Sequence, residues 1–354
     1  MGKVLKPKKV GICGHFYGEI PTSSGQVIKT RIVTDELRKK YGNDHVMTVD
    51  THGGFKAMPM MILQSLRMFI KCQSIVILPA QNGLKVIAPL FSLYNLIFSR
   101  SIHYVVIGGW LNELLGEHAF LIKILKKFDG IYVETLSMKK SLQGIGLDNI
   151  FIMPNFKNLD IVNESDIQVK SYKPYKLCTF SRVMQEKGIE LAIDAVERVN
   201  KRAGSIVFSL DIFGQVDDSY EERFTEIKKH FPEYIKYKGL VPFNESVSTI
   251  KKYYALLFPT YYAGEGFAGT LLDAMASGVP VVASDWKYNS EIIRNGVNGV
   301  LFKTKDIDEF TDKLEAIAEN TDGWQKMKVN CIREAGKYKP ENSVKVLVDN
   351  IGSD

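Results

Sequence analysis

The stretch Tyr261–Asp285, YYAGEGFAGTLLDAMASGVPVVASD, is the most informative part of the chain for its fold. It follows a strand-like run, Ala255–Pro259, and its glycines permit tight backbone geometry and close approach to a ligand. A helix is then expected over Gly269–Ser277, and the unpaired N–H groups at its start suit a diphosphate. The expected binding groups are five consecutive residues at this point, Gly266, Phe267, Ala268, Gly269 and Thr270.

Two carboxylates of this stretch, Glu265 and Asp273, are eight residues apart. Glu265 is expected in the loop and Asp273 about one turn into the helix, so the pair can bracket an elongated ligand that crosses the helix start. Carboxylates suit ribose and sugar hydroxyls because each can accept two strong hydrogen bonds. The alternative is an ordinary glycine-rich loop whose glutamate is solvated.

A second stretch, Thr179–Glu190 (TFSRVMQEKGIE), leaves a strand expected at Lys176–Ser181 and enters a helix. Arg182 and Lys187 lie at the carboxyl end of that strand, where a guanidinium and an ammonium can hold a diphosphate. When the anomeric bond of a nucleotide sugar breaks, negative charge grows on the departing diphosphate, and fixed cations stabilise it. Alone, such residues are more often solvated surface; together with the glycine loop they favour a binding site.

Short strand-like runs alternate with longer amphipathic runs along the chain, which predicts an α/β protein with parallel sheets covered by helices. Six strands are expected in the first half: Lys9–Cys13, Val46–Asp50, Ser74–Leu78, His103–Ile107, Gly130–Glu134 and Ile150–Met153. Six are expected in the second half: Lys176–Ser181, Ile206–Phe213, Ile235–Lys238, Ala255–Pro259, Val281–Ser284 and Gly299–Phe302.

The alternation breaks after Pro154 in a polar segment that we interpret as an interdomain linker. The predicted division is one Rossmann-like domain over residues 1–160, a second over 161–340, and a C-terminal helix over 341–354 that packs back on the first domain. A single helix, Ala119–Phe128, is expected between the fourth and fifth strands, and the last helix is expected at Asn342–Asn350. Ligands are expected at the carboxyl ends of the strands.

Bulk composition fits a globular protein of two domains. Of the 354 residues, 45% are hydrophobic and 24% are charged, which excludes wholesale disorder. The four cysteines, Cys13, Cys72, Cys178 and Cys331, form no CxxC pair, so we expect reduced thiols in a cytosolic protein. No apolar run reaches the roughly 20 residues of a membrane span.

Positive charge is concentrated in the first half of the chain. Residues 1–165 hold 20 Lys and Arg against 12 Asp and Glu, a net charge of +8, whereas the remaining residues carry a net charge of −2. This suggests attraction to anionic lipid or to a phosphate-bearing substrate, although a solvated basic surface accounts for it equally. Lys56–Gln73 and Val86–Phe98 are apolar runs with basic flanks, which could collect a lipid-linked acceptor at a bilayer interface. The alternative is that both are core helices covering a sheet.

The residues SRVMQEKG, followed roughly eighty residues later by GEGFAGTLLDAMASGVPVVASD, resemble glycosyltransferase family four, of the bacterial polysaccharide or glycolipid type. This family is retaining and has the GT-B fold, so the resemblance implies two Rossmann-like domains facing a central cleft. It implies an acceptor-binding first domain and a nucleotide-sugar-binding second domain. Glu265 would contact the donor sugar and Asp273 the nucleotide ribose. Arg182 and Lys187 would contact the diphosphate, and Gly214, in IFGQV, would lie near the nucleotide.

The chain departs from the family pattern at three places. The family usually has Glu where this chain has Asp273, and the shorter side chain has less reach. Ser24 and Gly25, after the first strand, stand where paired glycines usually face the donor sugar, although a helix cap by Ser24 accounts for them equally. Many members have a His after the fourth strand, where this chain reads GGW from position 108; we interpret His118 as an ordinary helix residue.

The resemblance implies a metal-independent hexosyltransferase that moves a sugar, with retention, from a nucleotide diphosphate to a glycan or lipid-linked saccharide acceptor. UDP is the expected nucleotide, and no cofactor or nucleic-acid partner is expected. The pair Asp306 and Asp308 is interpreted as a helix cap and not as a metal site. A cytoplasmic role in polysaccharide biosynthesis, with peripheral contact at the inner membrane face through the basic half, completes the prediction.

Two other functions are compatible with the same fold. One is a non-catalytic GT-B subunit that supports a partner transferase, against which the intact Glu265, Arg182 and Lys187 argue. The other is a nucleotide-sugar epimerase or a phosphorylase-like enzyme. It would need a different acid–base set or a pyridoxal-bearing lysine, and the sequence signals neither.

Overall fold

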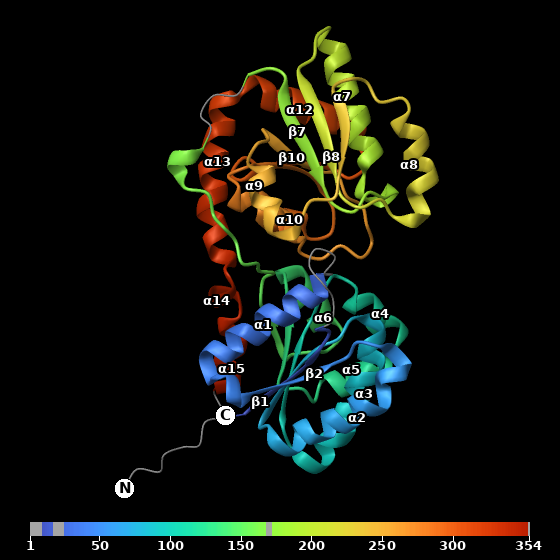
Figure 1. Ribbon diagram of the computed structural model, residues 1–354, viewed down its shortest axis with the longest axis vertical. Helices are drawn as coiled ribbons and strands as arrows, with labels where there is room; N and C mark the ends of the chain where they lie inside the picture. The colour runs from blue at the N-terminus through green and yellow to red at the C-terminus, as the bar shows by residue number, and fades with distance from the viewer. Residues whose placement is uncertain (1–8, 17–24, 168–171, 353–354) are drawn as a thin grey trace. The chain divides into compact units, whose positions relative to one another are not determined.

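The chain forms two compact units in a computed structural model that describes residues 9–16, 25–167 and 172–352, without the side chains of residues 54–56. One unit contains Met1–Lys157 together with Pro340–Asp354, and the other contains Asn158–Lys339. The chain therefore crosses between the units twice. Figure 1 shows the red C-terminal helices in the same unit as the blue helix α1.

The first unit is built on a six-stranded sheet in which neighbouring strands run parallel. Its strands are β1 (Val10–Gly14), β2 (Val46–Asp50), β3 (Ser74–Leu78), β4 (Ser101–Val105), β5 (Gly130–Val133) and β6 (Ile150–Ile152). Their order in the sheet is β2-β1-β3-β4-β5-β6. The chain runs from β1 outward to β2 and then returns past β1 to β3, so the strand order reverses between β1 and β3.

Helices cover both faces of this sheet (Figure 1). They are α1 (Gly25–Tyr41), α2 (Gly54–Lys71), α3 (Gln81–Phe98), α4 (Leu111–Glu117), α5 (Ala119–Leu125), α6 (Leu136–Gly144), α14 (Pro340–Ser343) and α15 (Lys345–Gly352). The core beside α1 contains Leu347 and Ile351 of α15. Asn350 Nδ2 donates a hydrogen bond of 3.0 Å to Tyr132 Oη of β5, which ties the end of the chain to this sheet.

The second unit repeats the design with the sheet order β12-β11-β10-β7-β8-β9. Its strands are β7 (Tyr175–Phe180), β8 (Phe208–Phe213), β9 (Ile235–Gly239), β10 (Ala255–Phe258), β11 (Val281–Asp285) and β12 (Gly299–Lys303). Its helices are α7 (Ile189–Ala203), α8 (Glu221–Lys228), α9 (Ser246–Ile250), α10 (Gly269–Ala276), α11 (Asn289–Ile292), α12 (Ile307–Glu319) and α13 (Thr321–Ala335). One core lies under α7 and α12, and a second lies under α9, α10 and α13.

All twelve predicted strands are present, each within two residues of its predicted ends. The prediction between β4 and β5 is wrong in one respect, because two helices, α4 and α5, occupy the place of one. The missed helix α4 buries Leu111, Leu114 and Leu115, an apolar pattern of only two turns that is too short to stand out in the sequence. The predicted helix Asn342–Asn350 is divided into α14 and α15.

Most of the large apolar side chains of the described residues are buried in these cores. Among the described residues, none of the helices is both long and apolar enough to cross a bilayer. The four cysteines are buried free thiols. Burial raises the pKa of Cys13 to about 12 and that of Cys72 to about 11.

Candidate functional site

The strand order of the second unit reverses between β7 and β10, which are neighbours in the sheet although they are far apart in the sequence. At such a reversal the loops leave toward opposite faces, and the space between them at the carboxyl ends of the strands is where ligands bind in parallel sheets. The loop after β7 carries Arg182 and Lys187, and the loop after β10 carries Glu265. Three of the predicted site residues therefore come from the two loops that flank the reversal.

An ion pair joins these two loops. Lys187 Nζ lies 2.6 Å from Glu265 Oε2, and the two side chains are 13% and 9% exposed. The sequence predicted that both side chains face a ligand, but it did not predict their contact across 78 residues of chain. Because solvent has little access to this charged pair, contacts with neighbouring protein groups fix the positions of the two side chains.

The backbones of the two loops lie in close contact. Gly188, which follows Lys187, has φ +71°, and a Cβ atom there would lie 2.2 Å from the carbonyl oxygen of Pro259 at the end of β10. The N–H of Tyr261 donates a 2.8 Å hydrogen bond to the carbonyl of Glu186. Only glycine permits this approach, so the KG pair of the sequence sets the position of the lysine.

Thr260 is a site residue that the sequence analysis missed. Its buried Oγ1 lies 2.8 Å from Glu265 Oε2 and donates to it, so this carboxylate oxygen receives both a hydroxyl and an ammonium. The ammonium of Lys187 also lies 4.9 Å from the ring centroid of Tyr262. Thr260 and Glu265 are only five residues apart, but the sequence does not show that the loop after β10 turns so that their side chains meet.

Arg182 has a different environment from Lys187. Its side chain is 63% exposed, and its Nη1 lies 3.3 Å from Oδ2 of Asp217, which follows β8. The Ser219 hydroxyl and backbone N–H donate to Asp217, and these bonds together with Arg182 lower the pKa of this aspartate. The guanidinium is therefore held at the carboxyl edge by one weak surface contact and stays accessible to an anion.

The helix α10 begins beside the same loops. It runs over Gly269–Ala276, and Ala268 at its N-cap provides no side-chain hydrogen bond, so its first N–H groups have no cap from that position. Thr270 Oγ1 donates a 2.6 Å hydrogen bond to the carbonyl of Phe180, the last residue of β7. The helix start is thereby fixed next to the strand from which the loop of Arg182 leaves.

Asp273 lies in the second turn of α10 and is buried, with 4% of its surface exposed. A buried aspartate needs polar partners, and its position one turn from the helix start agrees with the predicted spacing from Glu265. Gly214, after β8, has φ +134°, and a Cβ atom there would lie 1.8 Å from the carbonyl oxygen of Ser181. This glycine is thus required by the close approach of the ends of β7 and β8, next to Arg182.

The residues predicted for the first unit have fewer contacts that bear on a binding site than those of the second unit. Gly25 is the first residue of α1, and a Cβ atom there would meet nothing within 4 Å. Ser24, the proposed helix cap, lies outside the described residues. His118 lies at the junction of α4 and α5 and not inside a helix, and its ring is 6.1 Å from that of Phe120.

No group of three or more His, Cys, Asp or Glu within the described parts of the chain is arranged to hold a metal ion. Asp306 Oδ1 accepts a 3.0 Å hydrogen bond from the N–H of Glu309, which confirms its prediction as the cap of α12.

These two parallel sheets with their carboxyl-edge loops define a protein of the GT-B fold class. A crystal structure of Anabaena HepE in complex with UDP matches 98% of this chain and 100% of that chain, with a TM-score of 0.76 and 14% identity, which is a likeness of fold. Residues 161–338 match the model of the family "Glycosyl transferases group 1". The chain belongs to this family of glycosyltransferases.

Two curated relatives illustrate the range of the family. A Streptococcus parasanguinis protein, the GtfA subunit of a UDP-N-acetylglucosamine–peptide N-acetylglucosaminyltransferase, is 30% identical over 154 residues, which are 43% of this chain and 29% of that protein. A phosphatidyl-myo-inositol mannosyltransferase of Mycobacterium leprae is 28% identical over 193 residues, 54% of this chain and 50% of that protein. This chain therefore matches no more than half the length of these relatives.

Proposed function

We propose that the protein is a retaining hexosyltransferase that moves a sugar from a UDP-sugar to a glycan or a lipid-linked saccharide. The observation that carries the proposal is the 2.6 Å pair between Lys187 Nζ and Glu265 Oε2 at the strand-order reversal of the second unit. A nucleotide sugar is elongated and has an anionic diphosphate next to a polyhydroxyl ring. The paired cation and carboxylate offer one group to each part of such a ligand.

Each predicted residue has a role in this proposal. Arg182 and Lys187 bind the diphosphate, Glu265 accepts hydrogen bonds from hydroxyls of the donor sugar, and Asp273 accepts them from the ribose. Gly214 lets the nucleotide approach the ends of β7 and β8. The remaining donor-binding groups are backbone N–H groups at the start of α10 and the first residue of α1, namely Gly266, Phe267, Ala268, Gly269, Thr270 and Gly25.

The proposed reaction needs no nucleophile from the protein. The bond between the anomeric carbon and the diphosphate oxygen breaks, and the acceptor oxygen forms a new bond on the same face of the sugar. The acceptor proton passes to the departing diphosphate, whose growing negative charge is stabilised by Arg182 and Lys187. Since these fixed cations supply the charge stabilisation, we propose that the reaction is independent of metal.

The printed names of related proteins support the donor class. The streptococcal relative is named for UDP-N-acetylglucosamine, and the structurally similar Anabaena protein was crystallised with UDP. The mycobacterial relative is named for phosphatidyl-myo-inositol, a lipid, which supports a lipid-linked acceptor.

The proposal is tested with a panel of UDP-sugars, each incubated with the purified protein without acceptor while release of UDP is followed. We expect slow hydrolysis of at least one donor and its loss in Glu265→Ala. The control is Glu319→Ala, an exposed glutamate at the end of α12. Equal hydrolysis by Glu265→Ala and the unchanged protein would remove the proposed role of this carboxylate.

A second candidate is a subunit that acts with a partner chain. The name of the streptococcal relative describes it as a subunit, and a similar structure is a GtfA/B complex. Under this proposal the isolated chain binds UDP but transfers no sugar, and activity returns when the partner is added. Transfer by the isolated chain, measured with the same donors and an acceptor, would exclude an obligatory partner.

A further inference from the structure

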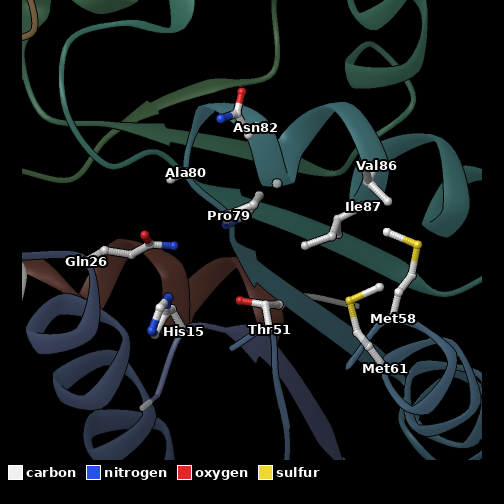
Figure 2. A pocket seen from close by; sticks show the side chains of 11 residues that line it. His15, Gln26, Thr51, Met58, Met61, Pro79, Ala80, Asn82, Val86 and Ile87 are labelled. Atoms are coloured by element: carbon white, nitrogen blue, oxygen red, sulfur yellow. The ribbon is translucent and has the colours of Figure 1, made fainter. Parts of the chain in front are cut away.

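A pocket lies in the first unit at the reversal of strand order between β1 and β3. Its volume is about 270 Å³, and it is lined by His15, Thr51 and Pro79, which follow β1, β2 and β3, together with residues of three helices (Figure 2). This is the position at which parallel sheets bind ligands. The volume lies just below the roughly 300–1,000 Å³ of typical ligand pockets, so the pocket suits one terminal sugar better than a long chain.

One end of the pocket is polar. Figure 2 shows His15 and Gln26 on the same side of the pocket, with Thr51 toward its middle. Gln26 Nε2 donates a 3.1 Å hydrogen bond to the carbonyl of Leu78, which fixes the amide at the end of β3. Among the described residues that line the pocket there is no Lys, Arg, Asp or Glu. Such hydrogen-bonding side chains suit sugar hydroxyls, whereas a phosphate would call for a lysine or an arginine.

The opposite end of the pocket is apolar. Met58 and Met61 of α2 face Ile87 and Val86 of α3 there (Figure 2). Methionine side chains adapt to irregular apolar groups. Val86 is 39% exposed, so this end of the pocket continues onto the outer surface of the helices.

An exposed apolar surface follows from that end. Leu93 and Ile97 come seven and eleven residues after Val86, which places all three on one side of α3, and they are 58% and 77% exposed. The neighbouring helix α2 exposes Met60 and Leu63. A group of exposed apolar residues on two neighbouring helices, unlike single exposed leucines, marks an interaction site. In the described part of the second unit the exposed large apolar side chains lie apart along the chain, at Tyr172, Ile206, Leu240 and Tyr262.

The chain segment that forms this apolar surface carries charge of one sign. From Thr51 to Asn112 the chain contains no Asp or Glu, while it contains five Lys and Arg. Arg67 is exposed on α2 between the apolar residues of its outer side. A surface that combines exposed leucine and isoleucine with basic residues, and excludes acidic ones, is complementary to an anionic bilayer.

We propose that this pocket is the acceptor site and that its occupant is the terminal sugar of a glycolipid in an anionic membrane. The sugar hydroxyls lie against His15, Gln26 and Thr51, and the first part of the apolar chain lies between the methionines and Val86. The rest of the lipid continues along the apolar surface of α2 and α3. This assignment rests on the proposed function, because it names the substrate class of the same reaction.

The first experiment measures flotation of the full chain with vesicles of phosphatidylglycerol and phosphatidylcholine. The unchanged protein is expected to float with the anionic vesicles and not with pure phosphatidylcholine. The variant L93S/I97S should lose at least tenfold in binding, whereas I206S, an exposed apolar residue of the second unit, should not. Equal flotation of L93S/I97S and the unchanged protein overturns the proposal. A protein dimer that is lost in L93S/I97S while no vesicle is bound also overturns it.

The second experiment uses matched octyl and methyl glycosides below the micelle concentration as probes for the pocket. At least one octyl glycoside should bind tenfold more tightly than its methyl partner, as measured by ligand-observed NMR. V86D should remove this difference, and I206D should preserve it, since both positions are exposed enough to accept a charge. Methyl glycosides that bind as well as octyl glycosides, or no effect of V86D, overturn the glycolipid assignment.

The two proposals fail separately. UDP binding and hydrolysis of UDP-sugars test the second unit and do not involve the octyl chain. A protein that hydrolyses a UDP-sugar but does not distinguish octyl from methyl glycosides keeps the proposed function and loses the glycolipid acceptor. A protein that binds the octyl glycoside but no UDP-sugar loses the proposed function itself.

Discussion

Lys187 Nζ and Glu265 Oε2 are 2.6 Å apart, and each side chain keeps less than a sixth of its surface exposed. Removal of one partner from such a pair leaves the other charge with a desolvation cost that nothing offsets. The Thr260 hydroxyl remains bound to Glu265 Oε2, so the loss is partial. The pair therefore links the stability of the second unit to the arrangement of its proposed donor site.

The first prediction concerns stability. Lys187→Ala should destabilise the second unit by about 3 kcal/mol, because it leaves the Glu265 carboxylate without its cation. The double variant Lys187→Ala/Glu265→Gln should be less destabilised than the sum of the single variants, with a coupling of about 1–3 kcal/mol. Urea unfolding followed by tryptophan fluorescence measures this, since two of the three tryptophans, Trp286 and the buried Trp324, lie in the second unit. Additive effects would show that the pair contributes no coupling.

The second prediction concerns catalysis. Glu265→Gln keeps the shape of the side chain and removes its charge, so kcat should fall by about 10²–10³ while UDP affinity changes less than threefold. The comparison of kcat with UDP binding separates a role at the sugar from a role at the nucleotide. A matched change at the exposed residue, Glu319→Gln, should alter neither value. Loss of UDP binding in Glu265→Gln would contradict the proposed contact with the sugar and indicate a contact with the nucleotide.

The third prediction concerns Arg182. Because its side chain is 63% exposed, Arg182→Ala should leave the melting temperature unchanged. UDP affinity should fall about tenfold, and Arg182→Lys should restore only part of it, because lysine lacks the planar fork. Arg202→Ala is the control, since Arg202 is a surface residue that pairs with Asp312. Calorimetric titration with UDP gives the affinities, and an unchanged affinity in Arg182→Ala would exclude the diphosphate contact.

The sequence predicted the elements of the fold well because each strand is a short buried run whose pattern is local. It could not predict the contacts between loops. Lys187 and Glu265 are 78 residues apart, and only the placement of β10 beside β7 brings them together. The pocket at the carboxyl ends of β1 and β3 was missed for the same reason. Its polar and apolar residues come from six separate elements, and no local pattern connects them.

Gly214 provides the fourth prediction. A Cβ atom there would lie 1.8 Å from the Ser181 carbonyl oxygen, at a φ that side chains rarely adopt, so Gly214→Ala should cost at least about 2 kcal/mol. Gly25→Ala, with open space around its Cβ, should change stability by less than about 0.5 kcal/mol. Thermal unfolding compares the two variants. If Gly25→Ala is stable but binds UDP-sugar more weakly, the loss reports a ligand contact at the start of α1; a stable Gly214→Ala would contradict the close approach of β7 and β8.

The fifth prediction follows from the buried thiols. A thiol reacts as the thiolate, and burial raises the pKa of Cys13 to about 12 and that of Cys72 to about 11. The folded protein should therefore react slowly with an aromatic disulfide reagent at pH 8, whereas the denatured protein should release four equivalents, one per cysteine.

The same shifts set the sign of a pH effect. Above about pH 9 the thiols of the unfolded chain ionise, while those of the folded chain keep their protons until about pH 11–12. The unfolded state then binds fewer protons, so the free energy of unfolding is fully retained below pH 9 and falls as the pH rises above it. The slope of the unfolding free energy against pH is proportional to the number of protons released on unfolding. Cys13→Ala should lower that number by about one, since it removes one thiol with a raised pKa. A slope that is identical in Cys13→Ala and the unchanged protein would show that Cys13 is already accessible in the folded state.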